Sequence, residues 1–360
     1  MQSIGYSGGG LSYTQSFTYD SLNRLATAQE NNGSNWSQTN AYDRYGNSQI
    51  NYGGGSYNLS FSTTTNRITT SGYSYDSAGN LTNDTLHTYT FDAENKILKV
   101  DNTTAYVYDG EGQRVKKLVG ENTRFIYGIG GELVAEFNGS TGSLKKEYVY
   151  GSGMAATIEP IVGTKYTTSD TLGSPRVVTN SSGSVVSRHD YMPFGDEIGS
   201  GVGGRTTGMG YGAADGVRQK FTSKERDTET GLDYFVARYY SSSQGRFTSP
   251  DEFSGGPREL FVLGSGDAKK QALPYADITQ PQSLNKYSYV YNMPYPYSDP
   301  DGHCGVPTGL KSGQVGICVA SYIKTYWVKG LDAVMVETLT ARAEHLALRF
   351  ECLWMPAKVL

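Results

Sequence analysis

An aromatic residue followed by aspartate recurs in the first third of the chain, and this repeat constrains the fold more than any other feature. The pairs are Tyr19-Asp20, Tyr42-Asp43, Tyr75-Asp76, Phe91-Asp92 and Tyr108-Asp109. Three residues after each aspartate comes Asn or Gly, namely Asn23, Gly46, Gly79, Asn95 and Gly112. An aspartate that opens a turn can accept backbone hydrogen bonds, and Asn or Gly tolerates the left-handed conformation that closes it. The recurrence predicts a series of β-hairpins that turn at these aspartates, rather than isolated surface turns.

The composition favours the same fold class. The 360 residues include 29 Tyr and 45 Gly, and only 18% are charged. Before two of the turns the sequence alternates, as in Tyr73-Ser74-Tyr75 and Tyr106-Val107-Tyr108, which puts every second ring on one face of a sheet. We therefore expect an all-β protein of repeated antiparallel hairpins.

Charge and cysteine content narrow the functional classes. A net charge of -4 without a basic cluster gives no reason to expect binding to nucleic acid. We see no signal peptide at Met1 and no apolar run long enough to span a bilayer, so we expect no membrane span. Cysteine occurs only at positions 304, 318 and 352, which does not make a disulfide framework.

The stretch Gly231–Asp251, G-L-D-Y-F-V-A-R-Y-Y-S-S-S-Q-G-R-F-T-S-P-D, contains a second constraint. It reads as a strand over Tyr234–Tyr240, a Ser-Ser-Gln-Gly turn and a short return to Asp251. Arg238 lies among aromatic residues, where a charge needs a partner. Asp299-Pro300 follows later in the chain and supplies another aspartate.

These motifs resemble the RHS/YD-repeat family, the shell-forming proteins of bacterial toxin systems. The clearest matches are D-S-A-G-N-L-T from Asp76, the Leu-Gly-Ser-x-Arg turn from Leu172, the Tyr-x-Pro-Phe-Gly segment from Tyr191, the core stretch from Gly231 and the D-P-x-G from Asp299. The resemblance covers nearly all of Phe17–Gly302. It implies a spiralling sheet that encloses a hollow shell, in which each hairpin packs on its neighbours.

The resemblance also implies a division of the chain and a set of partners. We expect YD repeats over residues 1–160, the RHS repeat-associated core over 161–302 and a variable C-terminal tip or truncated toxin remnant over 303–360. The implied partners are the chain's own tip or effector, upstream shell repeats and secretion machinery. The implied location is secreted or at the cell surface.

Many members of the family cut their own chain after a D-P-x-G-L motif. Carried over by motif, the residues implicated are Arg238, Asp251 and Asp299, and the scissile bond is His303-Cys304. Two close carboxylates cannot both ionise cheaply, so one serves as acid and the other as base. This chain has His303 where the family has leucine. At most, therefore, we expect an intramolecular aspartic autoprotease that needs no cofactor. The alternative is structural: Arg238 and Asp251 form a buried ion pair, and Asp299 begins a turn.

Three further segments have specific expectations. The glycine-rich segment Ile198–Gly212 should be an exposed loop. The segment Ser254–Gln282 should loop out, so that a strand over Lys286–Tyr291 returns beside Phe235–Tyr240. In the tail, Ala333–Trp354 has the apolar spacing of an amphipathic helix.

The tail does not have the pattern of a metal site. His303, Cys304, Cys318, His345 and Cys352 are residue types that bind zinc, but their spacing fits no zinc finger, so we expect no metal.

Two functional classes follow from the sequence. The first is the C-terminal part of a shell that encloses and delivers an effector and cuts itself near His303-Cys304. The second is a non-catalytic module whose Tyr- and Asn-rich faces bind glycans or cell surfaces. A self-cut chain gives two fragments, whereas a binding module stays intact.

Overall fold

The computed structural model describes residues 3–53, 55–56, 59–118, 120, 122–151, 153–251, 281–303 and 305–308. One compact unit comprises Met1–Asp251 and Asn285–Thr308. In the second unit, Glu252–Leu284 with Gly309–Leu360, only residues 281–284 are described, as the 3-10 turn η5 (Pro281–Leu284). Nearly all of the expected insertion, and the helix expected over Ala333–Trp354, lie outside the described residues.

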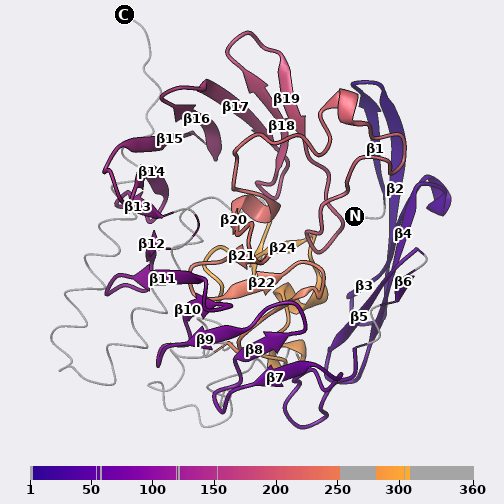
Figure 1. The fold of residues 1–360 in the computed structure, drawn as a ribbon. Helices are drawn as coiled ribbons and strands as arrows, with labels where there is room; N and C mark the ends of the chain where they lie inside the picture. Colours follow the sequence, from indigo (N-terminus) through magenta and orange to yellow (C-terminus); the bar gives the residue numbers. More distant parts are fainter. Residues whose placement is uncertain are drawn as a thin grey trace, which may run out of the picture. The chain divides into compact units, whose positions relative to one another are not determined.

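Antiparallel hairpins make up the described fold, so the all-β expectation is confirmed (Figure 1). The N-terminal sheet consists of β1 (Ser3–Gly8), β2 (Leu11–Tyr19), β3 (Leu25–Glu30), β4 (Trp36–Tyr42), β5 (Ser48–Tyr52) and β6 (Gly55–Ser56). A short pair follows, β7 (Tyr73–Tyr75) and β8 (Leu81–Asp84). In both sheets each strand pairs with the next in sequence, so the chain adds hairpins without crossovers.

The second large sheet has eleven strands. They are β9 (Tyr89–Phe91), β10 (Ile97–Val100), β11 (Thr104–Tyr108), β12 (Arg114–Lys117), β13 (Thr123–Tyr127), β14 (Leu133–Asn138), β15 (Leu144–Tyr150), β16 (Met154–Glu159), β17 (Gly163–Ser169), β18 (Pro175–Asn180) and β19 (Val185–Arg188). The segment after β19 forms a smaller sheet and a separate strand pair. These are β20 (Glu225–Arg226), β21 (Asp233–Tyr234), β22 (Tyr239–Ser241) and β23 (Arg246–Phe247), then β24 (Tyr297–Ser298) with β25 (Val306–Pro307).

The turns predicted at the five aspartates are confirmed. The Asn or Gly three positions on has a positive φ in every case, from 60° at Asn95 to 99° at Gly79. Its N–H donates to the carbonyl oxygen of the aspartate at 3.0–3.3 Å. The aspartate Oδ1 in turn accepts the N–H of the residue four positions on, at 2.8–3.0 Å. The repeat is thus a local hydrogen-bonding unit that fixes each hairpin.

The same turn recurs twice where the aromatic-Asp pattern does not reveal it. The N–H of Gly173 donates to the carbonyl oxygen of Asp170 at 3.0 Å, and the N–H of Gly183 donates to that of Asn180 at 3.0 Å. Asn180 takes the place of aspartate, because its side-chain oxygen accepts the same backbone donors. The hairpin series therefore extends through β18 and β19.

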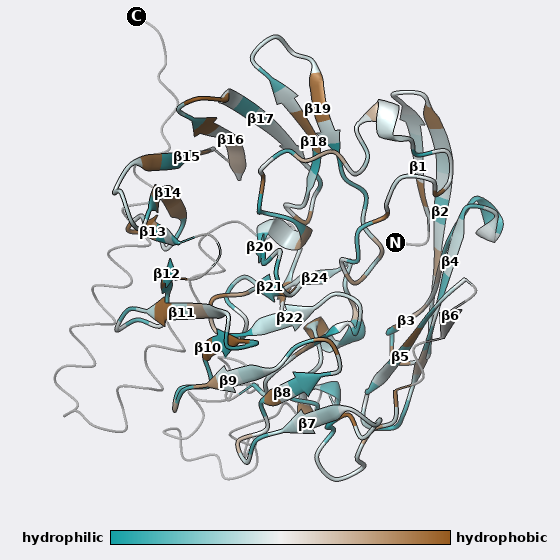
Figure 2. Cartoon of the chain, viewed as in Figure 1, coloured by the Kyte–Doolittle hydropathy of each residue, from teal (hydrophilic) through white to brown (hydrophobic). Residues whose placement is uncertain are grey.

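Alternation along the strands supplies the buried faces. In β2, Leu11, Tyr13, Gln15 and Phe17 are buried while Ser12, Thr14 and Ser16 are exposed or half-buried. Figure 2 shows hydrophobic residues interspersed with hydrophilic ones along the strands. Burying one face of each strand favours the sheet by about 25 cal/mol for each Å² of apolar surface removed from water.

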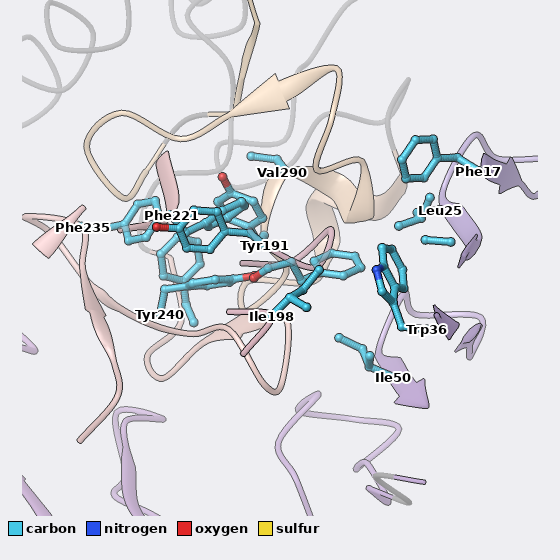
Figure 3. Close-up of a cluster of buried hydrophobic side chains, with 14 residues drawn as sticks. Phe17, Leu25, Trp36, Ile50, Tyr191, Ile198, Phe221, Phe235, Tyr240 and Val290 are labelled. Atoms are coloured by element: carbon cyan, nitrogen blue, oxygen red, sulfur yellow. The ribbon is translucent and has the colours of Figure 1, made fainter. Parts of the chain in front are cut away.

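The segment after β19 fills the space that the buried faces line. Its aromatic residues pack with residues of β2–β5 in one cluster (Figure 3). From the sheet come Phe17, Leu25, Ala28, Trp36 and Ile50, and from the later segment Tyr191, Phe194, Ile198, Phe221, Phe235, Tyr240, Phe247, Tyr289 and Val290. A second cluster joins Leu232, Tyr234 and Tyr239 to strands β9–β11. The later segment is therefore a shared core for both large sheets.

Two fully buried arginines attach this core to the sheets. Arg205 makes two hydrogen bonds of 2.9 Å to the carboxylate of Glu30 at the end of β3, and its Nε lies 2.5 Å from Asp190. Arg114 on β12 contacts the carboxylate of Asp227 at 2.6 and 2.9 Å. Since Arg205 has no exposed surface, the prediction that Ile198–Gly212 is an exposed loop is wrong at its centre. An ion pair with the sheet overrides the glycine-rich composition there.

Candidate functional site

The segment predicted as one strand over Tyr234–Tyr240 reverses direction at its centre, so that prediction is wrong. β21 ends at Tyr234, β22 begins at Tyr239, and the two strands pair antiparallel. Within the reversal, Val236 has a φ of 65°. A β-branched residue rarely adopts this conformation, and such outliers concentrate at functional sites. The reversal carries Arg238 at its end.

The Asp-Pro-Asp-Gly turn packs against this reversal. The N–H of Ala237 donates to the carbonyl oxygen of Asp301 at 3.0 Å, and Arg238 Nε donates to the carbonyl oxygen of Gly302. Gly302 has a φ of 86°, and an added Cβ would lie 2.6 Å from the carbonyl oxygen of Phe235. Both the backbone conformation and the close approach therefore require glycine at position 302.

The three residues proposed from the sequence come together in this buried site. Arg238 Nη2 lies 3.5 Å from Asp251 Oδ2 and 3.7 Å from Asp299 Oδ2. The guanidinium carbon lies 3.6 Å from the centre of the Phe247 ring, which holds it from one side. All three side chains are buried, so the arginine compensates two carboxylates in a setting with little water.

Asp251 is fixed by the chain returning at Lys286. The N–H of Asp251 donates to the carbonyl oxygen of Lys286 at 2.8 Å, and that of Phe247 donates to Tyr287 at 2.9 Å. We predicted a strand over Lys286–Tyr291 beside Phe235–Tyr240. The chain does return there, since Arg238 Nη1 donates to the carbonyl oxygen of Lys286 at 3.0 Å and the Tyr289 ring packs against those of Phe235 and Tyr240. The prediction of a strand is wrong, because β22 already pairs with β21 and β23, and the returning backbone makes an isolated bridge on the far side of β23.

His303 contacts the site directly. Its Nδ1 lies 3.0 Å from Asp251 Oδ1, and its N–H donates to Asp301 Oδ1 at 3.0 Å. The predicted scissile bond His303-Cys304 follows at once, but Cys304 lies outside the described residues. The carbonyl that Arg238 binds belongs to Gly302, one peptide bond earlier.

Burial and neighbouring charge shift the protonation of Asp299. Burial, and after it the nearby carboxylates of Asp301 and Asp251, raise the pKa of Asp299 from 3.8 to about 7, against the opposing effect of Arg238. A carboxyl group with this pKa keeps its proton near neutral pH and can act as an acid. Asp299 is therefore suited to donate a proton.

Two lysines and one aspartate complete the site, and sequence reasoning assigned them no role. Lys224 Nζ donates to the carbonyl oxygen of Pro300 at 2.5 Å, and burial lowers the pKa of Lys224. Burial lowers the pKa of Lys286 to about 8, against the opposing effect of Asp251. Asp301 accepts from the backbone of His303. The sequence could have pointed to Lys224 and Asp301, because they lie inside the segment K-F-T-S-K-E-R-D and the motif D-P-x-G.

Chemically, the arrangement can polarise a backbone carbonyl and supply an acid and a base beside it. Arg238 Nε donates to the carbonyl oxygen of Gly302, the atom on which negative charge would develop if the Gly302-His303 bond were hydrolysed. Among the described residues, no group of three His, Cys, Asp or Glu side chains could hold a metal ion. Within the same residues, no helix is long and apolar enough to cross a membrane.

Replacing Gly302 by alanine should separate the turn from the reversal. The new Cβ meets backbone at 2.6 Å, and the positive φ disfavours any side chain, so the contact between Arg238 and the Gly302 carbonyl should be lost. We expect a loss of about 1–3 kcal/mol in the free energy of unfolding, measured by urea denaturation. Gly183→Ala is the matched control, because Gly183 has a φ of 79° but nothing within 4 Å of the added Cβ. An equal loss in both variants would show that only the backbone conformation matters.

The raised pKa of Asp299 predicts a pH dependence of stability. Because the folded chain binds this proton more tightly than the unfolded chain, its stabilising effect is complete below pH 3.8 and is lost as pH rises through about 7. In an Asp251→Asn chain, we expect Asp299→Asn to raise the free energy of unfolding at pH 8 by on the order of 1–3 kcal/mol. The gain should shrink toward pH 5. Urea denaturation at both pH values measures it, and a gain independent of pH would contradict the assignment.

The hairpin series and the buried core define a class of β-hairpin repeat protein whose sheets pack on a shared core. The chain belongs to the Teneurin YD-shell family, whose family model matches residues 3–256. The resemblance to YD repeats is thereby confirmed.

Sequence relatives include two named nucleases. The tRNA3(Ser)-specific nuclease WapA of Bacillus spizizenii is 30% identical over 241 residues, and the tRNA nuclease WapA of Bacillus subtilis is 29% identical over the same length. Each match covers 64% of this chain but only 9% of the relative. Salivary gland surface protein 1 of Aedes aegypti is 29% identical over 151 residues, 42% of this chain and 3% of that protein.

Solved structures have the same fold. The Tc holotoxin pore of Photorhabdus luminescens matches with a TM-score of 0.55 and 20% identity, over 83% of this chain and 15% of that one. The TcdB2-TccC3 complex without its hypervariable C-terminal region matches with a TM-score of 0.55 and 20% identity, over 84% of this chain and 16% of that one. These matches show the fold, and this chain spans about a sixth of their length.

Proposed function

We propose that this chain is the C-terminal part of an RHS/YD shell that encloses and delivers a C-terminal effector, and that its core cuts the chain near His303-Cys304. The observation that carries the proposal of cleavage is the meeting of Arg238, Asp251 and Asp299 beside the Gly302 carbonyl. These residues lie far apart in sequence, and the reversal that brings Arg238 there includes a strained residue.

The proposed reaction is hydrolysis of one peptide bond. Asp251 takes a proton from water, whose oxygen attacks the carbonyl carbon of His303, and Arg238, which binds the neighbouring Gly302 carbonyl, stabilises the resulting oxyanion. Asp299 gives its proton to the leaving nitrogen, so that a carboxyl group and an amine are formed as the C–N bond breaks. Cleavage should therefore slow as pH rises through the pKa of Asp299, which is about 7.

The proposal of enclosure and delivery depends on the relatives. The curated relatives named as tRNA nucleases extend well beyond the matched region, as do the toxin chains in the solved structures. By analogy, a larger shell would use residues 1–160 as wall, 161–302 as core and 303–360 as the start of a tip. A location outside the producing cell, and contacts with upstream repeats and secretion machinery, belong to this proposal.

A denaturing gel tests cleavage against the binding-module alternative. Wild-type protein should give two bands after purification, and Asp251→Asn should give one. A single band for folded wild-type protein would favour the alternative, in which the same residues form a buried ion pair and the exposed strands bind a glycan or a cell surface.

A further inference from the structure

The reversal that presents Arg238 contains a strained three-residue turn. The N–H of Ala237 donates to the carbonyl oxygen of Phe235 at 2.7 Å, with Val236 between them at a φ of 65°. A turn of this kind with a positive φ is a rare and strained γ-turn, and a β-branched residue at its centre adds to the strain. Such a turn persists only where its surroundings hold it.

One side chain from a distant hairpin holds this turn. Lys96 Nζ donates to the carbonyl oxygens of Val236 and Ala237, at 3.0 and 3.1 Å. These two consecutive carbonyls converge on a single ammonium group, although the lysine lies about 140 residues earlier in the chain. The contact joins the hairpin series to the core at the residue before Arg238.

The backbone of Lys96 is itself fixed by the fourth aromatic-Asp turn, where its N–H donates to Asp92 Oδ1 at 2.9 Å. In three other repeats, the side chain at the equivalent position bonds back to the repeat's own aspartate: Arg24, Asn47 and Asn80. Lys96 reaches across to the core. Its path passes Gly112, the turn glycine of the next repeat, where an added Cβ would lie 3.2 Å from Lys96 Cε.

The held turn faces the stretch that would be cut. The Ala237 N–H also donates to the carbonyl oxygen of Asp301 at 3.0 Å, and the next residue, Arg238, donates to Gly302 and lies between the two carboxylates. We propose that Lys96 is a positioning residue for self-cleavage, which ties formation of the fourth hairpin to the alignment of Arg238. This inference rests on the proposed function, because it assigns Lys96 a part in the same reaction.

The first test is the rate of cleavage of the full chain. Lys96→Met keeps the aliphatic stem beside Gly112 but removes the donors, so cleavage should slow by about 10- to 100-fold. Lys96→Arg should restore at least part of the rate, because it can donate to both carbonyls. Lys99→Met, at an exposed position of the same hairpin, should cleave like wild type. The pH profile of the residual activity should be unchanged, since Lys96 does not transfer protons.

A merely structural role predicts a different pattern. If Lys96 only stabilised the fold, Lys96→Met would lower the unfolding midpoint in proportion to the loss of cleavage rate. Lys96→Arg would then not restore the cleavage rate when its stability equals that of Lys96→Met. That result, or an unchanged rate in Lys96→Met, would overturn the proposal.

A second readout separates this inference from the proposed function. In the uncleaved Asp251→Asn chain, hydrogen exchange of the Ala237 amide reports whether the turn is held. We expect exchange at least about tenfold faster in the additional Lys96→Met variant, with exchange in β10 and β11 unchanged. Equal protection of Ala237 with and without the lysine would overturn the positioning role, even in a chain that cleaves. A third outcome is faster exchange of Ala237 in the Lys96→Met variant of a protein whose wild type is never cut. This would support the role of Lys96 in positioning the turn and would refute self-cleavage.

Discussion

Replacing Asp251 by asparagine is expected to abolish self-cleavage while the fold survives. The amide has the shape of the carboxylate but cannot take a proton from water, and removing a general base lowers rates by about 10²- to 10⁴-fold. Asp299→Asn should have an effect of the same size, because the amide cannot supply the proton that the leaving nitrogen needs. A time course on denaturing gels measures both.

The control is a carboxylate of the same chain outside the site. Glu111 is exposed in the turn after Asp109, and Glu111→Gln should cleave at the wild-type rate. Far-UV circular dichroism should show the same β spectrum for all variants. If either aspartate variant is cut as fast as wild type, the acid-base roles assigned here are wrong.

Removing the Arg114 side chain should destabilise the protein more than any surface change. Arg114 is fully buried, binds both carboxylate oxygens of Asp227 and lies 3.0 Å from Glu225. Its guanidinium also lies over the rings of Tyr106 and Tyr234, at 4.7 and 4.6 Å. Arg114→Met leaves buried carboxylates without their main partner, which typically costs about 3–5 kcal/mol.

Urea denaturation with a matched arginine control measures this effect. Arg124 is exposed on the neighbouring strand β13, and Arg124→Met should change stability by about 0.5 kcal/mol or less. Adding Asp227→Asn to Arg114→Met should cost less than the sum of the two single changes, because they share one interaction. A loss near that of the Arg124 control would mean that the ion pair does not attach the core to the sheet.

The hairpin series was predictable from sequence because its determinants are local. In the first turn, for example, the N–H of Asn23 donates to the Asp20 carbonyl oxygen and that of Arg24 donates to the Asp20 side chain, so four or five residues define the hairpin. Asn180 was missed because asparagine replaces aspartate there without changing the hydrogen bonds.

The reversal at Val236 was not predictable from its own residues. Its sequence has high strand propensity, and the turn forms because Lys96 and Asp301 satisfy its backbone from elsewhere in the chain, while Gly302 allows the close approach. Tertiary contacts override local propensity at such places. The buried course of the loop around Arg205 was missed for the same reason, since its partner Glu30 lies 175 residues away.

The candidate site was predictable only in part. Motif resemblance supplied Arg238, Asp251 and Asp299, which the fold brings together, but no pattern in the sequence identifies the contacts of Lys96 or Lys286. A lysine in a turn is usually solvated, and only the three-dimensional path past Gly112 distinguishes Lys96. The catalytic roles of the three motif residues stay predictions.

Mass spectrometry of the purified wild-type chain tests the central claim most directly. We predict a fragment that begins at Cys304, together with its N-terminal partner, in folded protein and without added protease. A fragment that begins at His303 would support self-cleavage but would show that the Gly302-His303 bond is the one cut. Intact mass alone, in folded protein held at pH 5–7, would contradict self-cleavage and leave Arg238, Asp251 and Asp299 as a structural ion cluster.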